Sequence, residues 1–269
     1  MHRRILWALA VLITLVSAIY QRVTGPTYPA RGTVTLGGQT FKTRLTRTHG
    51  GPGDQPVAIT VPDQNIAGEI AWRRYPTNDA WQTMPLVRDG AVLRAALPHQ
   101  PVAGKLEYQS HLRLGNEAVV FPARPAITRF REVVPAYVLI PHVAAMFFFM
   151  LFSTAAALGA LAKMPQARRD AYVGIALLSI GGFVLGPLMQ YIAFGDWWTG
   201  IPFGWDLTDN KTLLAAIAWA FAAWRMRGGR EARTAIIVAA VVTLTVFAIP
   251  HSAWGSEHKW EQVPKASVK

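Results

Sequence analysis

The sequence contains no cysteine among its 269 residues, and this absence excludes several kinds of chemistry. No disulfide can stabilise an exported domain, so such a domain must be held together by its own core. A Cys-x-x-Cys-His site for covalent haem is excluded, as are thiolate metal sites and cysteine nucleophiles. The sequence also lacks Gly-x-Ser-x-Gly, His-Glu-x-x-His and a phosphate-cradling glycine loop, so it offers no familiar hydrolase or nucleotide-binding motif.

Charge is also scarce, since 16% of the residues are charged and 52% are hydrophobic. The fraction of charged residues is low for a soluble protein, and the composition is typical of a protein that crosses a membrane. The formal net charge is +12, but much of the lysine and arginine stands beside apolar segments. Basic residues in such positions set membrane orientation, so we predict a lipid bilayer as partner and no nucleic acid.

Residues 1–24 predict an N-terminal anchor helix. Arg3 and Arg4 precede the apolar run Ile5–Tyr20. A signal peptide begins in the same way, and Val16-Ser17-Ala18 approaches a cleavage site. We favour an uncleaved anchor, and with either reading the segment that follows is exported.

Residues 25–130 change character and predict an external, all-β, sandwich-like domain of the immunoglobulin-like kind. Glycine, proline, threonine and charges recur, and no apolar run is long enough to span a bilayer. Gly37-Gly38 and Asp89-Gly90 each lie between short β-favouring runs, which is a hairpin signal. Turn signals at such short spacing indicate a small antiparallel sandwich.

A linker is expected at Pro125–Pro135, followed by a four-helix membrane bundle over residues 131–252. Each expected helix has about the twenty residues that a bilayer requires, the last being the shortest. With the N-terminal anchor this makes five spans, and a polar, solvated tail is expected at 253–269. The four apolar segments are 137–162, 171–193, 207–226 and 234–250.

Charges in the connecting loops predict the orientation of these spans. The loop between the first two segments of the bundle carries Lys163, Arg168 and Arg169, and the loop between the last two carries four arginines. The loop 194–210 carries aspartates and no lysine or arginine. By the positive-inside rule the N-terminus is cytoplasmic, whereas the β domain, this loop and the C-terminal tail lie on the outer face, periplasmic or extracellular.

This topology brings two histidines and an aromatic loop to one face. His142 and His251 lie near the outer ends of two different spans, where two neutral imidazoles can hold one iron, although ordinary interfacial histidines also occur there. The loop between them is dense in tryptophan and glycine, which suits a flat apolar ligand as well as an interfacial belt. Asp206 can be interpreted as the N-cap of the next helix or as a functional group. The start of that helix also suits an anion such as a propionate.

Three segments carry a resemblance to a known family: Pro141–Met146, Gly195–Asp206 and Pro250–Gly255. Their order of histidine, tryptophan loop and histidine resembles the haem-handling membrane proteins of cytochrome c assembly, which have a tryptophan-rich WWD loop. The resemblance covers about residues 142–255. The chain departs from the pattern in having Phe194 where the family has tryptophan, and a longer gap, Thr199–Gly204, between the tryptophans.

The resemblance implies a membrane protein that binds haem b non-covalently and presents or transfers it to an exported apocytochrome. A b-type haem subunit that passes electrons is a variant of this reading. The implied axial ligands of the haem iron are His142 and His251, and Asp206 orients the loop or pairs with a polar group. The implied aromatic platform consists of Trp197, Trp198 and Trp205.

Other functions stay open at this stage. The β domain, displayed by a helical anchor, suits a non-enzymatic interaction subunit with other membrane subunits, and a sensor is a third reading. Four polar side chains of the loop region offer an oxygen-ligand site for calcium or magnesium, although their spacing matches no defined loop. These are Asp196, Asp206, Asp209 and Asn210. The sequence does not decide whether the protein is an enzyme.

Overall fold

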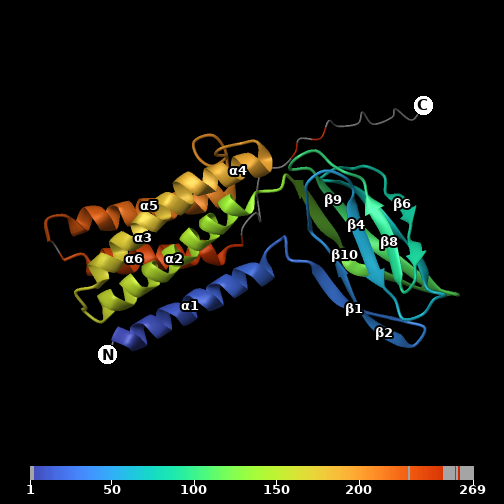
Figure 1. Cartoon of the computed structure of the whole chain (residues 1–269), viewed down its shortest axis with the longest axis horizontal. Coiled ribbons are helices and arrows are strands. Elements are labelled where there is room, and N and C mark those ends of the chain that lie inside the picture. Colours follow the sequence, from blue (N-terminus) through green and yellow to red (C-terminus); the bar gives the residue numbers. More distant parts are fainter. Residues whose placement is uncertain (1–2, 230, 251–257, 259, 261–269) are drawn as a thin grey trace. The chain divides into compact units, whose positions relative to one another are not determined.

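A computed structural model describes residues 3–229, 231–250, 258 and 260. It divides the chain into two compact units, one formed by residues 1–26 and 134–256 and the other by residues 27–133 and 257–269. We call them the helical unit and the β unit (Figure 1). The combination of helices with separate β-sheets that the sequence predicts is present.

The helical unit contains every apolar segment that was expected to be helical. α3, η1 and α4 form one continuous rod in which η1 is a π-helical turn. Among the described residues, three helices are long and apolar enough to cross a membrane, namely α1, α2 and this rod. The elements are α1 (Arg3–Thr24), α2 (Ala136–Leu161), α3 (Ala167–Ile180), η1 (Gly181–Leu185), α4 (Gly186–Phe194), α5 (Leu207–Met226), η2 (Arg227–Gly229) and α6 (Arg233–Ala248).

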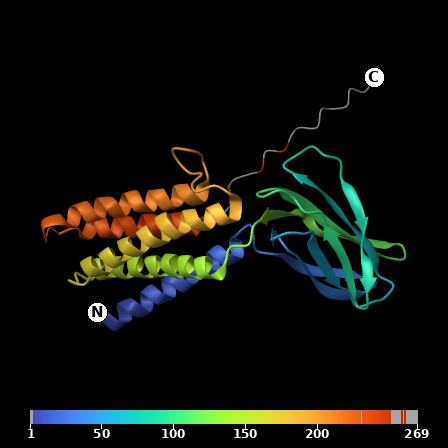
Figure 2. The same ribbon diagram turned by 45° about the horizontal axis from the view of Figure 1, so that its top comes forward.

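Small side chains let α2, α3, α5 and α6 pack closely along their lengths (Figure 2). Many buried positions are alanine, and a few large rings fill the remaining space between them. Phe149 lies edge-on to both Trp219 and Phe247, with ring centroids 6.4 and 6.0 Å away. The indole nitrogen of Trp219 donates to Thr243 Oγ1 at 2.9 Å, so the one polar atom of this ring is satisfied.

The described part of the β unit contains ten strands in three sheets. One sheet pairs β1 with β2, the second has the order β3-β10-β9-β5-β6, and the third has the order β4-β8-β7. All pairings are antiparallel except that of β3 with β10. The strands are β1 (Ala30–Leu36), β2 (Gln39–Leu45), β3 (Thr48–Gly50), β4 (Gln55–Thr60), β5 (Ala67–Tyr75), β6 (Gln82–Pro85), β7 (Val87–Asp89), β8 (Val92–Leu97), β9 (Lys105–Leu114) and β10 (Glu117–Arg131).

Both predicted hairpins are confirmed. Gly37 and Gly38 join β1 to β2 with φ of 60° and 71°, which are left-handed values that glycine adopts without strain. Gly90, with φ of 59°, lies in the turn between β7 and β8. A two-residue turn with positive φ matches the twist of the strands that it joins, so the sequence signal was sufficient here.

The linker expected at Pro125–Pro135 is wrong for most of its length, because β10 continues to Arg131. The register between β9 and β10 shifts between Phe121 and Ala126, and this irregularity takes the prolines out of the hydrogen-bonded ladder. After the shift, Ala126, Thr128 and Phe130 are buried in alternation. Proline therefore interrupts the pairing without ending the strand.

A polar network lies inside the apolar core of the β unit. Tyr108 is fully buried and its hydroxyl donates to the Thr46 carbonyl at 2.6 Å. Gln55 is also buried, donates to the Thr46 hydroxyl at 2.9 Å and accepts from Thr128 Oγ1 at 2.6 Å. Burial raises the pKa of Tyr108 to about 12, so the phenol stays neutral in this core at physiological pH.

Candidate ligand-binding site

One end of the helical unit gathers the elements that carry the predicted site. Gln21 near the end of α1 donates to the carbonyl of Phe247 at the end of α6. Lys211 at the start of α5 donates to the carbonyl of Ile249, just beyond α6. Val138 near the start of α2 packs in one cluster with Ala193 at the end of α4. The first turns of α2 and α5 therefore lie beside the last turns of α1, α4 and α6.

A buried carboxylate holds the loop between α4 and α5 at this end. Asp209, which is 6% exposed, accepts hydrogen bonds at Oδ2 from the backbone nitrogens of Thr199 and Gly200 at 2.7 and 3.0 Å. Gln190 of α4 donates to the same oxygen at 3.2 Å. A charged acceptor makes stronger hydrogen bonds than a neutral one, so Asp209 fixes the middle of the loop to the start of α5.

Glycine is required where the loop approaches α5. A Cβ on Gly200 would lie 2.6 Å from Asp209 Cβ and 2.8 Å from Asn210 Oδ1, closer than van der Waals contact permits. Asn210 uses that oxygen to accept from the backbone nitrogen of Ile201 at 2.8 Å. Two consecutive side chains of α5 thus bind three consecutive backbone amides of the loop.

Asp206 is the N-cap of α5. Its side chain accepts from the backbone nitrogen of Thr208 at 2.8 Å, and its own backbone nitrogen donates to the Thr199 carbonyl at 3.0 Å. The capping role that the sequence allowed is therefore present. The Thr208 amide was one of the donors expected to face an anion at this helix start, and it is already used by Asp206.

The three loop tryptophans have different surroundings. Trp197 stacks on Tyr191 of α4 with ring centroids 4.5 Å apart and planes 11° apart. Trp198 stacks on Phe183 of η1 at 5.9 Å, and its indole nitrogen donates to the Ile201 carbonyl at 3.1 Å. Trp205 is 84% exposed. The loop thus lays two indoles along the rod that precedes it and presents the third at its surface.

The ring of His142 lies against the π-helical turn. Its Nδ1 is 3.0 Å from the carbonyl oxygen of Gly181, which also accepts from the backbone nitrogen of Gly186. A carbonyl only accepts, so Nδ1 carries the proton and, in the neutral ring, Nε2 holds the free lone pair. A histidine that ligates a metal is commonly oriented by this hydrogen bond from its second nitrogen to a backbone carbonyl.

The glycines of the turn allow its neighbours to approach. A Cβ on Gly181 would lie 2.8 Å from Met146 Sδ, and one on Gly182 would lie 2.7 Å from Thr212 Cγ2. The rod therefore packs closely against α2 and α5 at the level of His142. A larger residue at either position would force these helices apart.

His251, the second predicted ligand, lies outside the described residues. The described stretch that precedes His251 ends at Pro250, and the carbonyl of Ile249 lies 2.6 Å from Nζ of Lys211. Lys211 is 4% exposed. The start of α5 thus contributes a buried cation as well as the buried carboxylate Asp209. Sequence reasoning assigned no role to Lys211 and considered Asp209 only as a metal ligand. The sequence feature that could have indicated both residues is the cluster of charged residues at the start of an otherwise apolar helix.

The oxygen-ligand site considered from the sequence finds little support at this position. The oxygens of Asp209 and Asn210 accept hydrogen bonds from loop amides, and Asp206 caps its helix. Within the part of the chain that the structure describes, no group of three or more histidine, cysteine, aspartate or glutamate residues is placed to hold a metal ion.

Comparison of the chain with known protein families, with curated proteins and with solved structures finds no match. The resemblance of the tryptophan loop to the haem-handling family therefore stays a prediction, and the functional argument rests on the geometry of this end of the helical unit.

Proposed function

We propose that this protein binds haem non-covalently at the outer face of a membrane and presents or transfers it to exported apocytochromes, or serves as a b-type haem subunit. The observation that carries the proposal is the hydrogen bond from His142 Nδ1 to the carbonyl of Gly181. In the neutral ring this bond leaves the lone pair of Nε2 available to ligate a metal. This donor belongs to the same end of the helical unit as the tryptophan loop.

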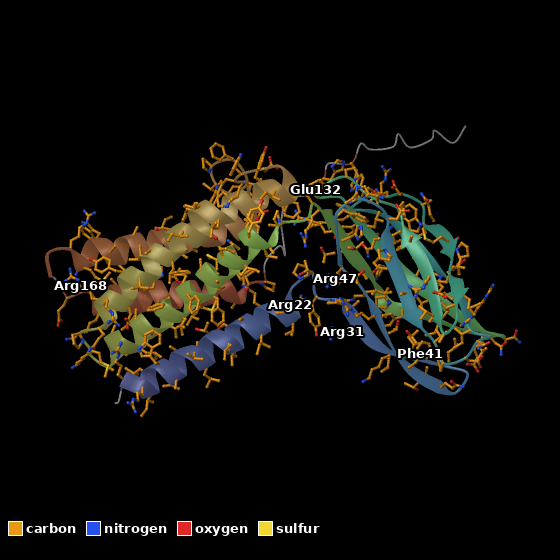
Figure 3. The ribbon with its side chains drawn as sticks, viewed as in Figure 1. Arg22, Arg31, Phe41, Arg47, Glu132 and Arg168 are labelled. Carbon is orange, nitrogen blue, oxygen red and sulfur yellow. The ribbon has the colours of Figure 1, made fainter. Side chains whose placement is uncertain are left out.

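The membrane part of the proposal comprises five spans, with an external sandwich-like domain. Large apolar side chains on the outside of the helices support it, among them Leu12, Ile217 and Val241, which water would disfavour and lipid accepts. The basic turn that contains Arg168 lies at the opposite end of the helical unit from Arg22 (Figure 3). By the positive-inside rule that turn is cytoplasmic, which puts the tryptophan loop, the β unit and the C-terminus on the outer face.

The residues present fit a haem group. His142 provides an imidazole nitrogen, and His251 follows α6, whose end lies at the same end of the unit. Trp197, Trp198 and Trp205 provide aromatic surface, and the capping by Asp206 keeps the loop attached to α5. Bound haem would be held by His142 and His251 and would supply an iron centre that exchanges one electron. The chain's own contribution is to orient the imidazoles and to hold the loop.

Absorption spectra of the detergent-purified protein, oxidised and dithionite-reduced, test this function. We expect a Soret band and sharp reduced bands in the wild type, altered in His142→Ala and in His251→Ala and lost in the double variant. His99→Ala is the matched control, because His99 belongs to the β unit and bonds to Gly53. This variant should keep the wild-type spectrum.

Two results would overturn the proposal. One is a colourless protein that also fails to bind added haemin, which would favour the interaction subunit that displays the β unit. The other is a haem spectrum that the double histidine variant leaves unchanged, which would remove both histidines as ligands.

A further inference from the structure

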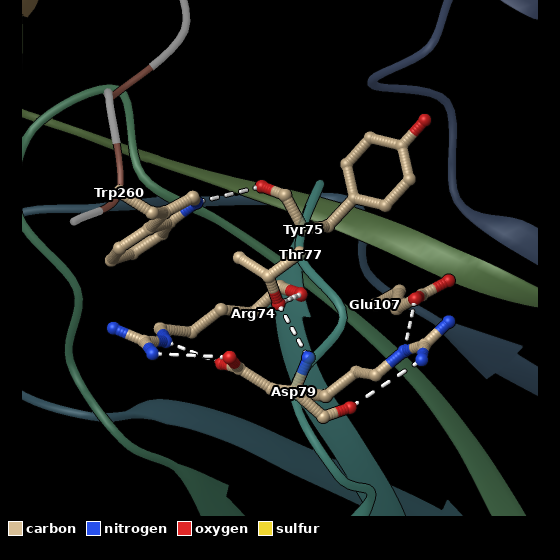
Figure 4. Close-up of polar contacts among 7 residues, drawn as sticks. Arg74, Tyr75, Thr77, Asp79, Glu107 and Trp260 are labelled. Carbon is tan, nitrogen blue, oxygen red and sulfur yellow. Dashed lines mark hydrogen bonds and ion pairs between the residues drawn. The ribbon is translucent and has the colours of Figure 1, made fainter. Parts of the chain in front are cut away.

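A tryptophan from the C-terminal segment is seated on the β unit (Figure 4). The indole nitrogen of Trp260 donates to the carbonyl of Tyr75, at the end of β5, at 3.0 Å. The backbone nitrogen of His258 lies 3.4 Å from the carbonyl of Ala103, and the rings of His258 and Trp260 are in edge contact at 4.7 Å. The two described residues of the tail are therefore both in contact with the β unit, although the sequence predicts a solvated tail.

Arg74 covers the indole. Its guanidinium carbon lies 5.2 Å from the centroid of the Trp260 ring, within the range of a cation–π interaction. The guanidinium is held in place by Asp79, with Nε to Oδ2 at 2.5 Å and Nη2 to Oδ1 at 3.2 Å. This hydrogen bonding lowers the pKa of Asp79, so the carboxylate stays ionised and keeps Arg74 fixed at neutral pH.

Gly104 leaves room for the far edge of the indole. A Cβ at this position would lie 3.3 Å from Cη2 of Trp260 and 2.7 Å from the Pro101 carbonyl. An acceptor, a cation over the ring and a glycine at its far edge together match the chemistry of an indole, which has one N–H donor and an electron-rich face. We define the indole cradle as Arg74, the Tyr75 carbonyl and Gly104.

We propose that the indole cradle is a peptide-binding site of the β unit and that the C-terminal segment of the same chain is its resident ligand, which acts as a latch. The latch holds His258 and Trp260 on the β unit. The proposal does not depend on haem.

Limited trypsin digestion of the full-length protein in detergent tests the latch. Lys259 lies between the two seated residues, so cleavage after it requires the segment to leave the cradle. Cleavage after Lys265 gives a reference rate in the same tail, and mass spectrometry separates the two released peptides. Arg74→Ala should accelerate cleavage after Lys259 about tenfold relative to the reference, because it removes the cation over the ring.

Arg73→Ala is the matched control. Arg73 is the neighbouring residue of β5 and is also ion-paired; it bonds to Glu107 at 2.5 Å, lies over the ring of Trp81 and donates to the backbone carbonyl of Asp79 at 3.4 Å. The carboxylate oxygens of Asp79, which hold Arg74, are not among these partners. We expect this variant to be cleaved after Lys259 at the wild-type rate. Equal rates in the wild type, Arg74→Ala and Arg73→Ala would overturn the latch.

A double-mutant cycle with Trp260→Ala separates docking from other effects. Trp260 follows the scissile bond directly, so its substitution also changes trypsin's preference, and the cycle cancels that contribution. In the Trp260→Ala background, Arg74→Ala should cause no further acceleration. An equal acceleration in both backgrounds would show that Arg74 acts elsewhere and would overturn the cradle. Since the digestion needs no haem, its failure and that of the proposed function are distinguishable.

Discussion

The helical unit and the β unit differ in where most of their leucine, isoleucine and valine side chains lie. The interior of the β unit is built from leucine, isoleucine, phenylalanine and tyrosine. The interior of the helical unit is rich in alanine, while many leucine, valine and isoleucine side chains lie on its outside. In the β unit these side chains are buried away from water. In the helical unit many of them face outward, as they do in a protein surrounded by lipid.

Buried polar groups differ in the same way. In the β unit, Gln55, Tyr108 and Thr128 form a neutral network at the centre of the core. In the helical unit, the charged side chains of Asp209 and Lys211 are buried at one end, where they bind backbone groups of a loop and of a helix terminus. The buried charges of Asp209 and Lys211 thus hold the ends of the site in place, whereas the Gln55–Tyr108–Thr128 network lies within the core of the β unit.

The largest effect is expected from Asp209→Ala. The substitution removes the acceptor of two buried loop amides, and we expect a loss of about 4 kcal/mol in the free energy of unfolding. Thermal unfolding of the purified protein measures it, and the haem spectrum should weaken because the loop is released. Asp196→Ala, an exposed aspartate of the same loop, is the control. Equal stability of the two variants would refute the anchoring role of Asp209.

Paired lysine substitutions sharpen the comparison of the two surfaces. Leu12 of α1 is 56% exposed and Val87 of the β unit is 65% exposed. If both side chains faced water, a lysine at either position would have a similarly small effect on stability. If α1 crosses a bilayer, Leu12→Lys costs about 3 kcal/mol of insertion free energy. Val87→Lys should change stability by less than about 0.5 kcal/mol.

The amount of each variant that resists carbonate extraction from membranes measures this difference. We expect a marked loss for Leu12→Lys and the wild-type amount for Val87→Lys. The same membrane yield for both variants would contradict a lipid-facing α1.

A smaller effect is expected from Tyr108→Phe at alkaline pH. The pKa of Tyr108 is raised in the folded state, so stability is fully present below the ordinary tyrosine pKa and is lost as pH rises toward about 12. Between pH 8 and pH 11 the wild type should lose about 1.4 kcal/mol that Tyr108→Phe does not lose.

Guanidinium titrations of the full-length protein at the two pH values measure this difference. Tyr137→Phe, at an exposed tyrosine, is the control and should behave like the wild type. A pH dependence that Tyr108→Phe leaves unchanged would argue against burial of the phenol.

Local signals were sufficient for much of the fold. Gly37-Gly38 predicts its hairpin because positive φ is a property of the turn itself. The apolar segments predict helices because their length and composition are visible in the sequence. The linker prediction at Pro125–Pro135 failed because β10 continues to Arg131, and a register shift accommodates Pro122 and Pro125 within the strand.

The site was harder to predict, because its key contacts join residues that are distant in the chain. His142 and the loop tryptophans were named from the sequence, but the partner of His142 is the carbonyl of Gly181 in another helical segment. The burial of Lys211 depends on the end of α6, and the seat of Trp260 depends on β5. No local pattern specifies such pairs.

The π-helical turn at Gly181–Leu185 makes the number of residues in the rod as important as their identity. Such a turn contains one more residue than an α-helical turn, so α4 is rotated by about 100° relative to an uninterrupted helix. Deleting a single glycine there would restore a regular helix with almost the same composition. It would turn Gln190 and Tyr191 away from the loop that they now contact, and it would withdraw the carbonyl that orients His142.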